Sequence, residues 1–165
     1  MHGQIGRYHW AEIGGEHLGL KEVIAALTPH LLGLVAGNIS WDSGFLQELS
    51  RVPPGWKITS GRVISPPLDP DLLATWPQSE LEGGRYDEWY FWRSEPPALE
   101  LDAFCNWLGT SLSKAEDLAY PGGLDLAAQL ALADPEVVVG RGTFTYVIAK
   151  SEAPMRRLLE FEHAA

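Results

Sequence analysis

Proline is concentrated in the middle of this chain, where it limits the length of any regular element. Residues 53–97 contain eight prolines in 45 positions. Proline has no amide donor and a fixed φ, so long helices and central strands are disfavoured there. We expect a loop-rich central segment with short elements, and its aromatic content argues against a flexible linker. With 165 residues in all, the chain is expected to form one domain over residues 1–165.

Alternating and β-branched runs predict five strands. The expected strands are Gln4–Ile13, Trp56–Ser65, Asp87–Trp92, Glu136–Val139 and Thr143–Ala149. The last two flank Gly140-Arg141-Gly142, which predicts an antiparallel hairpin. In the second expected strand, the polar Ser60 and Arg62 indicate an edge position or a bend at Gly61.

Apolar residues at helical spacing predict several short helices. The expected helices are Leu20–Leu31, Ser43–Arg51, Leu101–Leu108, Leu124–Ala133 and Pro154–Glu162. In the first, Pro29 either ends the helix near Leu27 or begins a second helix capped by Thr28.

Because helices and strands are interspersed and the final strand pair is antiparallel, we expect an α+β fold. Its mixed, largely antiparallel sheet has four or five strands, packed by three to five short helices. A regular βαβ repeat with a parallel sheet is the second choice.

Negative charge is concentrated in the central third of the chain. The net charge is −10, and residues 69–117 hold eleven carboxylates against Arg85, Arg93 and Lys114. Such a surface repels phosphate backbones, so no nucleic-acid partner is expected. It attracts a basic protein, although a solvated acidic face that aids solubility explains the same charge.

The sequence gives little support for catalysis, a cofactor or a metal. Gly140-Arg141-Gly142 lacks the third glycine and the following helix of a dinucleotide loop. Cys105 lies on an apolar helical stripe, where a thiol is normally inert. His9 and His17 are seven residues apart, which fits no strong metal motif. No catalytic residue, metal site or cofactor is therefore predicted. Whether the chain is an enzyme stays open, although the missing motifs favour a protein that is not an enzyme.

Aromatic residues gather in the same acidic region. Four of the seven tryptophans lie there, and the strand Asp87–Trp92 is aromatic on both faces. One face must pack on the core. The other either packs under a helix or is exposed as a protein-binding patch rimmed by carboxylates. In that second case, the partner-binding residues are Glu80, Glu82, Asp87, Glu88, Trp89, Tyr90 and Trp92.

Two functional hypotheses follow. The first is a small acidic binding or inhibitor module, of immunity or antitoxin type, that docks on a basic protein. The second is an enzyme or small-ligand binder whose tryptophan-lined pocket includes polar groups such as His9, Arg62 or Asp87. The chain shows no signal-peptide pattern and no apolar run of bilayer length. With a single cysteine, which rules out an intramolecular disulfide, this predicts a cytoplasmic protein without a membrane partner.

Overall fold

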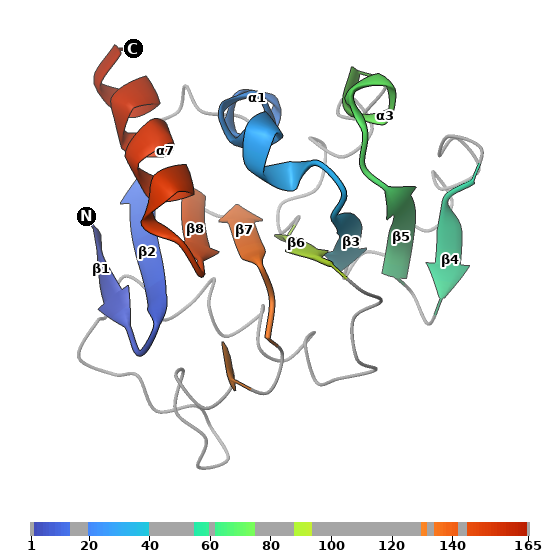
Figure 1. Cartoon of the computed structure of the whole chain (residues 1–165), viewed down its shortest axis with the longest axis horizontal. Helices are drawn as coiled ribbons and strands as arrows, with labels where there is room; N and C mark the ends of the chain where they lie inside the picture. The colour runs from blue at the N-terminus through green and yellow to red at the C-terminus, as the bar shows by residue number, and fades with distance from the viewer. Residues whose placement is uncertain are drawn as a thin grey trace.

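The fold is an α+β sheet structure, as the sequence predicts (Figure 1). The computed structural model describes residues 2–13, 20–39, 55–59, 62–74, 88–93, 130–131, 134–141 and 145–164. Its strands are β1 (His2–Ile5), β2 (Tyr8–Ile13), β3 (Val35–Ile39), β4 (Lys57–Thr59), β5 (Arg62–Pro67), β6 (Glu88–Trp92), β7 (Val137–Arg141) and β8 (Thr145–Ala149). Its helices are α1 (Leu20–Leu31), α3 (Pro70–Ala74) and α7 (Glu152–Ala164). None of these described helices is long and apolar enough to cross a membrane.

The described strands form one open sheet in the order β1-β2-β8-β7-β6-β3-β5-β4. Every pairing between them is antiparallel. The second choice, a parallel βαβ sheet, is therefore wrong. The hairpin expected near the C-terminus is confirmed as β7–β8, but β7 continues through Gly140 to Arg141.

The expected number of strands, four or five, is too low, because the described residues alone contribute eight. The run 4–13 is a hairpin rather than one strand. Gly6 has φ 56°, and a glycine with positive φ at the first position of a two-residue turn closes a hairpin. The run 56–65 likewise contains the β4–β5 pair, with β4 at the sheet edge. The strand β3 was not expected.

The local sequence of β3 explains why it was missed. Gly37 and Asn38 both disfavour strands, yet β3 pairs with β5 on one side and β6 on the other. A register shift between Val35 and Gly37 interrupts the β5 pairing. There the Ser65 hydroxyl accepts a 2.8 Å hydrogen bond from the buried Ala36 amide. Tertiary pairing therefore overrides the weak local preference.

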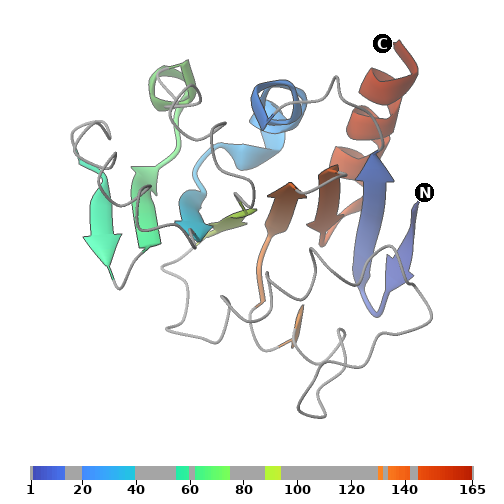
Figure 2. The same cartoon turned by 180° about the vertical axis from the view of Figure 1, so that it is seen from behind.

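The three described helices cover one face of the sheet (Figures 1 and 2). The predicted apolar stripe of α1 is confirmed for Val23, Ile24, Leu27 and Leu31, which are all buried. The helix continues through Pro29 to Leu31, so neither expected break occurs. The sequence predicts that α7 buries Met155, Leu158 and Leu159; Met155 and Leu158 are buried, whereas Leu159 is half-buried. The core contains these side chains and those of the facing strands, including Trp89 and Phe91.

The other face of the sheet carries aromatic rings stacked on glycines. Three cross-strand pairs share this pattern: Gly3 with Trp10, Gly37 with Tyr90, and Gly140 with Tyr146. A Cβ built on each glycine would lie 1.7–2.7 Å from the nearest atom of the partner ring. Only glycine leaves room for a ring lying flat across the neighbouring strand. This face is buried too, because Trp10, Tyr90 and Tyr146 are each less than 9 % exposed.

Candidate functional site

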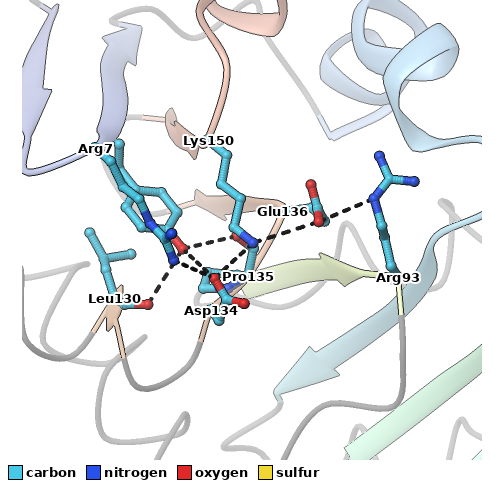
Figure 3. Close-up of polar contacts among 8 residues, drawn as sticks. Arg7, Arg93, Leu130, Asp134, Pro135, Glu136 and Lys150 are labelled. Carbon is cyan, nitrogen blue, oxygen red and sulfur yellow. Dashed lines mark hydrogen bonds and ion pairs between the residues drawn. The ribbon is translucent and has the colours of Figure 1, made fainter.

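The densest group of polar side chains in the described residues is an ion-pair network at one end of the sheet (Figure 3). Asp134 Oδ1 lies 2.7 Å from both Arg7 Nη2 and Lys150 Nζ. Glu136 Oε1 lies 3.6 Å from Lys150 Nζ and 3.3 Å from Arg93 Nε. Each carboxylate therefore contacts two cations, and Lys150 links the two halves of the network.

Asp134 is held at the centre of this network by its backbone. Leu130 and Ala131 are helical, and the Asp134 amide donates a 2.8 Å hydrogen bond to the Leu130 carbonyl. Asp134 has φ 45°, the left-handed conformation that ends many helices. Aspartate tolerates this conformation better than most residues, and Pro135 prevents the helix from continuing. The Lys150 ammonium, which donates to Asp134, holds the pKa of that carboxyl below its usual range.

Tyr8 joins the same network from β2. Its hydroxyl lies 3.3 Å from Asp134 Oδ1 and within 3.4 Å of the Leu130 and Pro135 carbonyls. All three of these neighbours are hydrogen-bond acceptors, so they favour the protonated phenol. Burial, reinforced by the negative charge of Asp134, raises the pKa of Tyr8 to about 12.

The network connects parts of the fold that are far apart in the sequence. Arg7 lies in the β1–β2 turn, Arg93 follows β6, Glu136 precedes β7 and Lys150 follows β8. Arg93 and Glu136 also flank the β6–β7 connection, so their ion pair joins its two ends. Within the network each carboxylate is offset by two neighbouring cations, and the network contains no histidine or cysteine. The arrangement is therefore better suited to holding these segments of the fold together than to catalysis.

A substitution of Tyr8 tests this description of the ion-pair network. The folded protein keeps Tyr8 protonated up to about pH 12, whereas the phenol of the unfolded chain loses its proton near pH 10. The contribution of Tyr8 to the free energy of unfolding is therefore complete below pH 10. It is lost as the pH rises from 10 to 12, by at most about 1.4 kcal/mol per pH unit. We expect the difference in unfolding free energy between wild type and Tyr8→Phe to shrink over this range. A difference that stays constant between pH 9 and 12, measured by urea unfolding, would contradict a raised Tyr8 pKa.

The aromatic residues predicted to bind a partner lie in the core. Trp89, Tyr90 and Trp92 are 0 %, 0 % and 3 % exposed. Trp89 packs edge to face against Trp56, with ring centroids 6.2 Å apart. Of the two alternatives for the strand, burial on both faces is therefore the one observed. The expectation that these rings anchor a partner is corrected accordingly, because an anchor has to be accessible.

Of the acidic residues predicted to bind a partner, the structure describes only Glu88. Glu88 is the first residue of β6 and pairs in register with Ile39 and Gly140. Glu80, Glu82 and Asp87 lie outside the described residues. Their role in partner binding stays a prediction.

The alternative pocket cannot combine His9 with Arg62. His9 is half-buried on β2, whereas Arg62 begins β5. Four strands lie between β2 and β5. At about 4.8 Å per strand, their backbones are roughly 24 Å apart. Asp87, Cys105 and His17 lie outside the described residues, which contain no group of three or more His, Cys, Asp or Glu placed to hold a metal ion.

Sequence reasoning did not identify the network around Asp134. One local signal was available, since Asp134-Pro135 after an alanine- and leucine-rich run is a typical helix stop. Nothing local indicates that Arg7, 127 residues away in the chain, donates to Asp134. That contact depends on the pairing of β2 with β8 and of β8 with β7.

No protein-family model, curated protein or solved structure matches the chain. Function must therefore be inferred from charge, burial and geometry.

Proposed function

We propose that the chain is a small acidic binding or inhibitor module, of immunity or antitoxin type, that docks on a basic protein. The supporting observation is the way charge divides along the chain. Residues 69–117 hold eleven carboxylates and three Lys or Arg, a net charge of −8. The rest of the chain holds eleven carboxylates and nine Lys or Arg, a net charge of −2. The acid excess therefore belongs to the central third of the sequence.

Asp134 and Glu136 each lie beside cations in the network. In residues 69–117, by contrast, carboxylates outnumber Lys and Arg by eleven to three. An unbalanced negative field of this kind steers a positively charged partner and accelerates its association. With Trp89, Tyr90 and Trp92 in the core, recognition is assigned to the carboxylates of the acidic region, among them Glu80, Glu82, Asp87 and Glu88.

The test starts with affinity purification of the tagged chain from its own host at low and high salt, read by mass spectrometry. A candidate basic partner is then purified, and its affinity is measured by calorimetry. With several ion pairs in the contact, we expect at least about a tenfold loss of affinity between 0.05 and 0.5 M salt.

A charge-reversal pair locates the contact. Glu80→Lys with Asp87→Lys should weaken binding by about tenfold or more, since like charges across an interface are unfavourable. The matched control is Glu152→Lys with Glu160→Lys, which makes the same charge change on exposed positions of α7. If both pairs weaken binding equally, net charge rather than this surface is responsible. Affinity that does not depend on salt, or no basic partner at either salt, would contradict the proposal and direct the work to small-ligand screening.

A further inference from the structure

The two edges of the open sheet differ in how they are protected against pairing. The edge strand β4 has three residues and carries the exposed Lys57, and Pro53 and Pro54 precede it in the chain. Short length, lysine and proline are the usual means of blocking an edge. The opposite edge strand, β1, has four uncharged residues without proline, and its register with β2 is regular.

Hairpin geometry determines which backbone groups of β1 face away from β2, at the edge of the sheet that the described strands form. Ile5 and Tyr8 flank the two-residue turn and form a hydrogen-bonded pair, and the pattern alternates along the strand. Gly3 is therefore bonded to Trp10 in β2. The N–H and C=O groups of His2 and Gln4 point away from β2, and the side chains of both residues are exposed.

We propose that a second copy of this chain pairs with β1 through its own β1. An antiparallel edge is complementary to itself under a two-fold rotation. Centring the rotation on Gly3 sets His2 of one copy opposite Gln4 of the other, and the four outward groups of each copy then satisfy one another. Gly3 meets Gly3 at the centre, where neither copy has a side chain to obstruct the approach. The result is a continuous sheet across two chains.

Charge distinguishes this contact from the binding of a basic protein. Two copies of net charge −10 repel each other, while β1 itself contributes no formal charge. Salt screens the repulsion and leaves the backbone hydrogen bonds in place. Self-association should therefore strengthen with salt, whereas association with a basic partner should weaken. The two proposals can fail independently.

Sedimentation velocity on the whole chain tests the pairing. Three paired residues from each copy, joined by four backbone hydrogen bonds, make a contact smaller than a standard interface, so we expect a weak dimer, populated at about 0.1–1 mM. Its population should rise several-fold between about 0.05 and 0.5 M salt. Gln4→Pro removes one outward amide, which an edge strand tolerates, and should leave the protein monomeric. Gln4→Ala keeps the amide and should dimerise like the wild type.

A second measurement does not depend on the proline variant folding. In the wild-type chain, hydrogen exchange at the His2 and Gln4 amides should slow as the protein is concentrated, while exchange at the Gly3 amide, already bonded to β2, should change little. A mass of 18.2 kDa at about 1 mM and high salt would overturn the proposal, as the expected dimer is populated there. So would a dimer that Gln4→Pro leaves intact while its circular dichroism matches the wild type.

Discussion

Gly140→Ala should destabilise the protein by about 3 kcal/mol, at the upper end of what overpacking a core usually costs. Gly140 pairs across β7 and β8 with Tyr146, whose ring lies over the glycine. A Cβ at position 140 would lie 1.7 Å from Tyr146 Cζ, and Tyr146 is only 4 % exposed. The ring has to move within a packed face, which outweighs the gain of about 0.4–1 kcal/mol that alanine normally brings by restricting the unfolded chain.

A double-mutant cycle shows whether the clash with the Tyr146 ring, rather than any substitution in strand β7, causes this loss of stability. In a Tyr146→Ala background the ring is absent, so adding Gly140→Ala should cost less than about 0.5 kcal/mol or become stabilising. Urea unfolding of the four proteins gives the coupling energy. Equal losses in both backgrounds would show that the ring is not the reason for glycine at this position.

Trp89→Ala is expected to lower the free energy of unfolding by about 3–5 kcal/mol. Trp89 is fully buried, belongs to the main core and packs against Trp56. Such a loss is a large fraction of the roughly 5–15 kcal/mol that stabilises a typical domain, so a reduced yield of folded protein is also expected.

Leu32→Ala is the matched control for this truncation. Leu32 is 44 % exposed at the end of α1, and its truncation should change stability by less than about 0.5 kcal/mol. Trp89→Ala also distinguishes the two roles considered for this tryptophan. A variant that keeps wild-type stability but loses a basic partner would place Trp89 on the surface and contradict the observed core packing.

Periodicity in the sequence predicts the elements whose pattern is local and strong. The stripe of α1, the strand β6, the β7–β8 hairpin and the buried face of α7 all match their predicted type. In the two helices the apolar spacing distinguishes helix from strand, and in the three strands the short runs of β-branched and aromatic residues do so. The α+β class follows from how these elements alternate. The alternating pattern predicts a single strand for each of the two hairpins, because a connection of two residues barely interrupts the alternation.

Composition and residue spacing are enough to predict the fold class and the uneven distribution of charge. Which residues meet depends on how the strands pair. Strand β3 forms because β5 and β6 pair with both of its edges, and Gly37 and Gly140 are needed because rings from neighbouring strands lie over them. Likewise, the Asp87–Trp92 pattern is compatible with either an exposed or a buried second face, and burial of Tyr90 and Trp92 is settled by packing. The Arg7–Asp134 contact spans 127 residues, a separation over which local patterns carry no information because strand order, not sequence spacing, sets the distance.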